Sequence, residues 1–133
     1  LLLHAHSDVD AIERLFRQYP AARILWAHSG FERPERIREM LKRHPNLWCD
    51  LAFRSDHASG GKVDSEWRAL FLEFPTRFML GTDTYTPERW HFVGEHAGWS
   101  RGWLADLPGD VAERIAFRNG EALFGVSATP GKP

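Results

Sequence analysis

The sequence predicts an α/β fold built from four parallel strand–helix units. Short apolar segments begin near residues 1, 23, 47 and 77, and a stretch with helical spacing of its apolar residues follows each one. The apolar segments show little alternation, as expected for strands that are covered on both faces. Strands that are separated by helices of this length pair in parallel.

The first unit consists of a strand at residues 1–5 and a helix over 8–19. Apolar residues recur through 8–19 at the spacing of one helix face. Ser7 or Asp8 is a suitable N-cap, and Pro20 ends the helix.

The second unit consists of a strand at 23–28, a loop at 29–33 and a helix that starts at Pro34. Proline is favoured at the first helical position. The buried stripe of this helix is Ile37, Met40 and Leu41, and the helix ends at 44–46.

The third unit has a strand at 47–52, a polar loop at 53–63 with 59–61 as its flexible tip, and a helix over 64–74. The fourth strand covers 77–82 and is followed by a long aromatic segment at 84–107.

Thr86 is a good start for a helix within that segment, and Asp110 and Glu113 have the spacing of a capping box. The final helical region ends near Phe124, and residues 126–133 are predicted to form a flexible tail.

The length indicates how much of a barrel the chain contains. A complete (β/α)8 barrel needs about 250 residues, and this chain has 133. We therefore expect a partial TIM-type (β/α) barrel of about four units, with residues 1–125 as its one domain.

Composition excludes several classes of protein. The chain has 17 basic and 18 acidic residues and no basic run, so nothing indicates a nucleic-acid partner. No apolar stretch approaches the roughly 20 residues that a membrane span needs, and no secretory signal is visible. A single cysteine, Cys49, fits a reducing compartment, so we expect a cytoplasmic protein.

Three of the predicted strands lead into a side chain that can bind a metal: His4, His28 and Asp83. Catalytic groups of β/α barrels converge at the carboxyl ends of the strands. Two imidazoles and one carboxylate are a typical ligand set for hydrolytic zinc. A carboxylate beside a metal-bound water can also take its proton and later deliver it.

Each of these residues has a simpler interpretation. His4 and His6 form a His-x-His pair that can lie at a solvated strand end, and His4 has the stronger strand context. His28 can be a core histidine that is bonded to a backbone carbonyl. Asp83 can cap the next helix, although Thr86 is better placed for that.

Further residues are candidates for substrate binding. Gly30 can adopt a φ that other residues avoid or leave room for a substrate, and Tyr85 lies in the loop after Asp83. Arg54 can bind a substrate carboxylate through two parallel hydrogen bonds, but a surface ion pair in the loop explains it equally well. Cys49 is expected to pack as a small apolar group. Four aromatic residues can either roof a pocket or, as we favour, join the core: Trp90, His91, His96 and Trp99.

In its order of motifs the chain resembles the C-terminal half of the amidohydrolase superfamily, in the branch called amidohydrolase-related or amidohydrolase 2. The resemblance covers residues 1 to about 125. It is carried by four segments in the same order: Ile24-Leu25-Trp26-Ala27-His28-Ser29-Gly30, Asn46-Leu47-Trp48-Cys49-Asp50-Leu51, Phe78-Met79-Leu80-Gly81-Thr82-Asp83 and Ile115–Gly125.

The resemblance implies that the four strands correspond to barrel strands five to eight. His4 then matches the metal ligand of strand five, and His28 matches the histidine of strand six, which binds a second metal or the substrate oxygen. Asp83 matches the aspartate of strand eight, a ligand and proton shuttle. The family's His-x-His pair of the first strand has no counterpart, so this chain supplies only two or three ligands.

We therefore expect a metal-dependent hydrolase that acts on an amide, ester or lactone carbonyl with a metal-activated water. The divalent metal would most commonly be zinc, with manganese or iron as alternatives. Two other functions remain open: zinc-dependent non-oxidative decarboxylation, in which Arg54 and His28 hold a carboxylate, and a non-catalytic half barrel that binds a ligand or self-associates. Expected partners are a small-molecule substrate and either a second copy or a missing N-terminal half.

Overall fold

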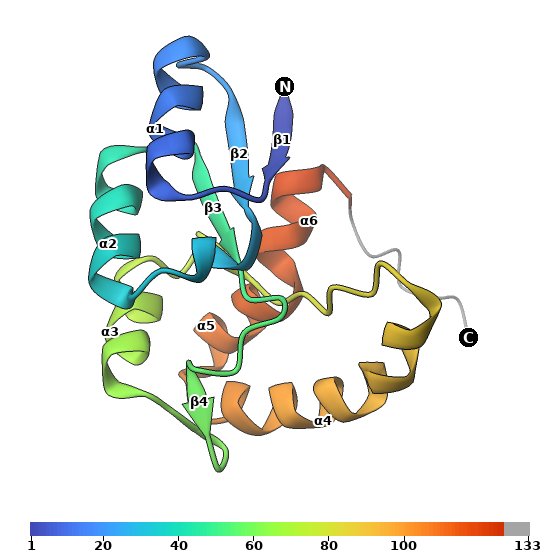
Figure 1. The fold of residues 1–133 in the computed structure, drawn as a ribbon. Helices are drawn as coiled ribbons and strands as arrows, with labels where there is room; N and C mark the ends of the chain where they lie inside the picture. The colour runs from blue at the N-terminus through green and yellow to red at the C-terminus, as the bar shows by residue number, and fades with distance from the viewer. Residues whose placement is uncertain (127–133) are drawn as a thin grey trace.

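The computed structural model describes residues 1–126, so the predicted tail at 126–133 lies outside the described residues except for Val126. Four parallel strands form one sheet in the order β1-β2-β3-β6 (Figure 1). Their bounds are Leu2–Ala5, Arg23–Trp26, Leu47–Asp50 and Phe78–Met79. The register places Leu3 opposite Ile24, Ile24 opposite Leu47, and Cys49 opposite Phe78. The predicted parallel α/β architecture is confirmed.

Helices cover the outer face of this sheet. Helices α1 (Val9–Gln18), α2 (Pro34–Arg43) and α3 (Ser65–Glu73) lie one after another along one side of the strands (Figure 1). Alternate strand residues such as Ile24 and Trp26 pack against them in the main core. Burial of this apolar surface is the principal force that holds the helices to the sheet.

The other face of the sheet has a smaller apolar cluster. Leu25 and Met79 pack there with Leu123 of helix α6 (Asn119–Phe124), and Leu2 and Trp48 are partly buried beside them. Before α6 the chain forms α5 (Gly109–Glu113) and a π-helical turn, η3 (Arg114–Arg118). Both faces of the strands are thus apolar, which explains why the strand sequences show little alternation.

One predicted helix cap is confirmed and another is wrong. The Oδ1 of Asp8 accepts a hydrogen bond from the amide of Ala11 at 2.8 Å, so Asp8 caps α1. Asp64, for which no cap was predicted, caps α3 by accepting a hydrogen bond from the amide of Glu66 at 3.0 Å. The predicted capping box at Asp110 is wrong, because α5 begins one residue earlier and Asp110 lies within its first turn.

The strands are shorter than predicted, and part of the predicted 53–63 loop is ordered. Residues 27–31 form a turn, η1 (Ala27–Phe31), instead of extending β2. Strands β4 (Ala58–Ser59) and β5 (Lys62–Val63) pair as an antiparallel hairpin around Gly60 and Gly61. Both glycines have positive φ, as the twist of a two-residue hairpin requires.

The segment after β6 contains η2 (Pro87–Phe92) and α4 (Val93–Leu104). The helical start after Thr86 is confirmed. Trp99 packs against the core, as expected, together with the buried Trp103, whereas Trp90 is 65% exposed and belongs to no core cluster among the described residues.

The side chain of Cys49 is buried in the main core, as predicted, and burial raises the pKa of its thiol to about 12. It therefore packs as an apolar group and is not a nucleophile. Within residues 1–126, no helix is both long and apolar enough to cross a membrane.

A buried imidazole anchors the 53–63 segment to α4. His57 is 1% exposed, and its ring contacts those of Trp99 and Trp103, with centroids 5.1 and 4.7 Å away. Burial lowers the pKa of His57 to about 4; the charges of Arg54 and His96 act in the same direction, and Asp56 partly offsets them. His57 is therefore neutral at neutral pH.

This burial predicts a loss of stability in mild acid. The unfolded chain accepts a proton on His57 near pH 6.5, whereas the folded chain resists it down to about pH 4. The free energy of unfolding is thus unaffected by His57 protonation above pH 6.5. It decreases as the pH falls below that value, by about 3 kcal/mol at pH 4. Urea unfolding between pH 7 and 4 measures this loss. The variant His57→Gln should show a flatter pH dependence than the parent chain, and equal slopes would contradict the prediction.

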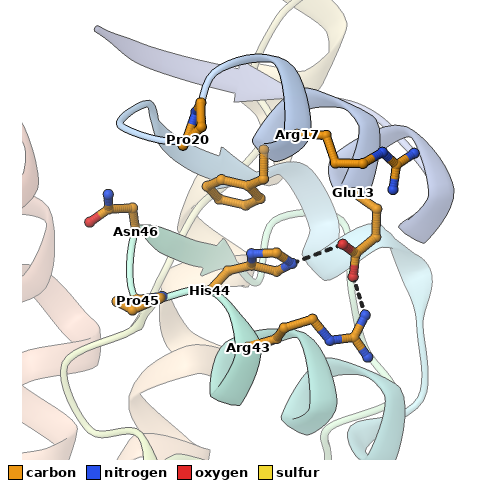
Figure 2. Close-up of a pocket in the computed structure, with 8 residues that line it drawn as sticks. Glu13, Arg17, Pro20, Arg43, His44, Pro45 and Asn46 are labelled. Carbon is orange, nitrogen blue, oxygen red and sulfur yellow. Dashed lines mark hydrogen bonds and ion pairs between the residues drawn. The ribbon is translucent and has the colours of Figure 1, made fainter.

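One cavity lies near the opposite ends of the strands from the predicted site. It has a volume of about 290 Å³, and Figure 2 shows the residues around it. His44 stacks on Phe16 with ring centroids 4.3 Å apart, and its Nε2 lies 3.1 Å from Glu13, which also pairs with Arg43. The ion pairs and the ring stacking thus link α1 to the end of α2 across this cavity, which indicates a structural role for the residues around it.

Candidate functional site at the carboxyl ends of the strands

The three predicted metal-binding residues border one cavity. His4 lies in β1, His28 in the η1 turn after β2, and Asp83 four residues after β6. They line a cavity of about 410 Å³ together with Asp50 and with an apolar wall that includes Phe124. Residues that are far apart in the sequence are therefore brought together at one edge of the sheet, as the strand-end pattern predicts.

A second cavity of about 550 Å³ shares His28 and Asp83 with the first. Its remaining lining residues are His6, Phe31, Phe53 and Tyr85. Tyr85, a predicted substrate-binding residue, is thus on the cavity wall and is 75% exposed.

His6 joins the two other imidazoles. Its ring centroid lies 5.1 Å from that of His4 and 4.9 Å from that of His28, in edge-to-face arrangements. The sequence ranks His6 below His4 because His6 follows the strand. In the structure this position places it between the two predicted ligands.

Asp50 is a site residue that the sequence analysis did not select. Its carboxylate is buried and accepts hydrogen bonds from the backbone amides of His28 at 2.8 Å and Ala52 at 3.1 Å. Its Oδ2 lies 3.0 Å from Nε2 of His4. Asp50 is the last residue of the apolar strand β3. The pattern that identified His4, His28 and Asp83, a polar side chain at the end of an apolar strand, could therefore also have identified Asp50.

The hydrogen bonds of His28 define its tautomer. Nδ1 of His28 lies 2.8 Å from the carbonyl oxygen of Ala52, which can only accept. In the neutral ring Nδ1 therefore carries the proton, and Nε2 carries the lone pair. The alternative that His28 is a histidine bonded to a backbone carbonyl is thus correct as to the hydrogen bond. His28 nevertheless borders both cavities.

Left-handed backbone is concentrated around the site. Among residues 1–126, positive φ occurs at five residues other than glycine: His28, Ser29, Phe31, Phe53 and Asp83. Four of the five line the two cavities. Such conformations cost free energy for residues with a Cβ atom and are found preferentially at functional sites.

Gly30 has a structural role in this turn. Its φ is +62°, and a Cβ atom there would overlap the indole ring of Trp26. The ring is held in place by a 2.6 Å hydrogen bond from Nε1 to the carbonyl of Ser7. The unusual φ predicted for Gly30 is confirmed, and the close approach of the Trp26 ring gives a second reason for a glycine at this position.

We expect Gly30→Ala to destabilise the chain by about 3 kcal/mol, through left-handed strain and overlap with Trp26. Gly60→Ala is the matched control, because Gly60 has a φ of +57° but open space around it. The control should cost about 1 kcal/mol. Urea unfolding of both variants measures the difference, and equal losses would show that packing on Trp26 is unimportant.

Arg54 is bound by the protein itself. Its side chain is 4% exposed; Nε and Nη2 donate to Asp56, and the two Nη groups donate to the carbonyls of His28 and Glu32 at 3.0 and 2.9 Å. Its guanidinium also lies 4.6 Å from the ring centroid of Trp67. This arrangement favours a role in holding the η1 turn over the predicted contact with a substrate carboxylate. The alternative of an ion pair is correct, but the arginine is buried and not on the surface.

The donors around the cavity are of the kind that divalent metals prefer: imidazole nitrogens and a carboxylate. No hydrogen bond of the Asp83 carboxylate to the described residues is found. Within residues 1–126, however, no three His, Cys, Asp or Glu side chains lie close enough together to hold a metal ion. The donor atoms are therefore chemically suitable for a metal, but the described residues do not form a complete set of ligands.

Comparisons with known proteins agree with this fold. A family model described as Amidohydrolase matches residues 2–126. An uncharacterized TIM-barrel protein of Bordetella bronchiseptica superimposes with a TM-score of 0.65 at 18% identity, over 93% of this chain and 44% of that one. The apo structure of a protein of Agrobacterium tumefaciens gives 0.63 at 20% identity, over 96% and 52%.

This chain thus spans about half the length of the solved structures that it matches, as expected for a partial barrel. No curated protein matches it. The match to the family model extends from β1 to the end of α6 and so includes every candidate site residue. The chain belongs to the amidohydrolase family.

Proposed function

We propose that this chain carries half of the active site of a metal-dependent hydrolase that cleaves an amide, ester or lactone. The observation that supports the proposal best is the common cavity of His4, His28 and Asp83 at the carboxyl ends of the strands. Family membership supports a hydrolase of the amidohydrolase type in general. The substrate class and the metal are part of the proposal.

His4, His28 and Asp83 would contribute ligands to a divalent metal whose coordination is completed by groups outside residues 1–126, with zinc as the first candidate and manganese and iron as alternatives. When bound, it would supply a hydroxide near neutral pH and polarise the substrate carbonyl. Asp83 is the proposed base, which takes a proton from water and returns it to the leaving group. His28 is a ligand or stabilises the developing oxyanion through its ring.

Hydrolysis is preferred over the decarboxylase alternative on one observation. The decarboxylase hypothesis uses Arg54 to hold a substrate carboxylate. The donors of Arg54 are directed to Asp56 and to two carbonyls of the chain. The buried position of this side chain leaves it poorly placed to bind a substrate anion.

We also propose that a partner completes the barrel, either residues outside 1–126 or a second copy of the chain. Among the described residues, β1 pairs only with β2, so one edge of β1 is free. Leu2 and Trp48 on the inner face are only partly buried. A parallel sheet of this kind is normally closed and covered on both faces.

Metal analysis tests the proposed function. The purified chain and a longer form, extended by the strands that we propose complete the barrel, are expected to differ, with about one equivalent of zinc, manganese or iron in the longer form only. The longer form should hydrolyse a panel of esters, lactones and amides and lose this activity with a chelator. A longer form that is folded, free of metal and inactive would rule the proposal out.

A further inference from the structure

We propose that Asp50 is a positioning residue that sets the tautomer of His4 and holds the backbone of His28. This inference deepens the proposed function and rests on it for the role of the two imidazoles. No comparison assigns a role to Asp50. It carries out no chemistry itself and acts through the two histidines.

The Asp50 carboxylate is enclosed by donors from two neighbouring segments. Asp50 as a whole is 6% exposed. A buried carboxylate is costly unless donors surround it. Oδ1 accepts from the amides of His28 and Ala52, and Oδ2 faces Nε2 of His4. Asp50 therefore connects β1 to the η1 turn.

The contact with His4 determines where that ring carries its proton. An ionised carboxylate can only accept hydrogen bonds. Nε2 of His4 must then carry the proton at the 3.0 Å contact. In the neutral ring the lone pair lies on Nδ1, which leaves this nitrogen available as a ligand.

The contacts with the main chain orient His28. The left-handed residues His28 and Ser29 are bonded to Asp50 twice: the amide of His28 donates to Oδ1, and the hydroxyl of Ser29 donates to the backbone carbonyl at 2.7 Å. The ring of His28 has its own fixed tautomer through Ala52. Asp50 thus sets the protonation pattern of one imidazole and the position of the other. Carboxylates that orient metal-binding histidines in this way are a general feature of metal sites.

The substitution Asp50→Asn isolates the effect on His4. The two backbone amides require an acceptor at the Oδ1 position, so the asparagine oxygen should remain there. The amide nitrogen then faces His4 and donates to Nε2. His4 must accept at Nε2 and move its proton to Nδ1, so its free lone pair is lost.

Nitrogen-15 NMR of the histidine side chains provides the test. In the parent chain we expect the Nε2–H tautomer of His4 and the Nδ1–H tautomer of His28. In Asp50→Asn, His4 should invert and His28 should keep its tautomer, whereas the control Asp56→Asn should change neither. An Nδ1–H tautomer of His4 in the parent chain overturns the proposal, and this measurement does not depend on the folding of any variant. An unchanged His4 in a folded Asp50→Asn variant also overturns it.

A cobalt titration of the longer form separates this inference from the proposed function. Asp50→Asn should weaken cobalt binding about 10- to 100-fold, as observed when partners of ligating histidines are removed. If His4 inverts and the affinity for cobalt is unchanged, Asp50 does set the tautomer, and the assignment of His4 as a ligand fails instead. The spectroscopic result therefore decides the role of Asp50, and the titration decides the role of His4.

Discussion

Asp83→Asn is expected to lower turnover of the complete protein by about 10²- to 10⁴-fold, the range for removing a general base. The carboxylate is the proposed base and ligand, and an amide can neither accept the proton nor neutralise a cation. The fold should persist. Asp83 has a φ of +53°, and asparagine tolerates this left-handed conformation as well as any residue with a side chain.

The matched control is Asp10→Asn, which makes the same change at an exposed position in the first turn of α1. It should leave turnover unchanged. Initial rates with the best substrate of the panel, and a thermal unfolding curve for each variant, are the measurements. If Asp83→Asn retains parental turnover, Asp83 is not part of the mechanism, whatever its place on the cavity wall.

The site residues that could be predicted from the sequence are those that follow one rule, a polar side chain at the end of an apolar run. An apolar run that ends in a polar side chain led to His4, His28 and Asp83, and these residues do border one cavity. The same rule applies to Asp50 after Leu47, Trp48 and Cys49, but Asp50 lay inside the predicted strand at 47–52 and was not recognised as a strand end. The partners that enclose Asp50, His4 and His28, are 46 and 22 residues away in the sequence, and no local pattern reports such contacts.

The fold was predicted more fully than its details. Periodicity and proline positions were sufficient for the four units, because they reflect local preferences and one-sided burial. The turn at 27–31 was missed, since the left-handed conformations at His28 and Ser29 are stabilised by hydrogen bonds to Asp50 and Arg54 that form only in the folded chain. The β4–β5 hairpin is different: Gly60-Gly61 is a recognised two-residue hairpin signal and could have been used.

Arg54→Met is expected to destabilise the chain by about 3 kcal/mol. The variant leaves the carbonyls of His28 and Glu32 without the donors that Arg54 supplies, and an unpaired buried acceptor costs about 1–3 kcal/mol. It also removes the cation that lies over Trp67. Methionine keeps the length and most of the apolar volume of the side chain, so the loss reports polar contacts more than a cavity.

The control for Arg54 is Asp56→Asn, which weakens the ion pair but keeps both carbonyl contacts. The side chain of Asp56 is 55% exposed, and exposed ion pairs contribute about 1 kcal/mol or less. Urea unfolding and steady-state kinetics together distinguish the two roles of Arg54. If Arg54 holds the η1 turn, Arg54→Met loses stability far beyond the control. If Arg54 binds a substrate carboxylate instead, the variant keeps its stability and raises KM for anionic substrates alone. That second result would restore the decarboxylase hypothesis, because it would show that this buried guanidinium can leave its protein partners for a ligand.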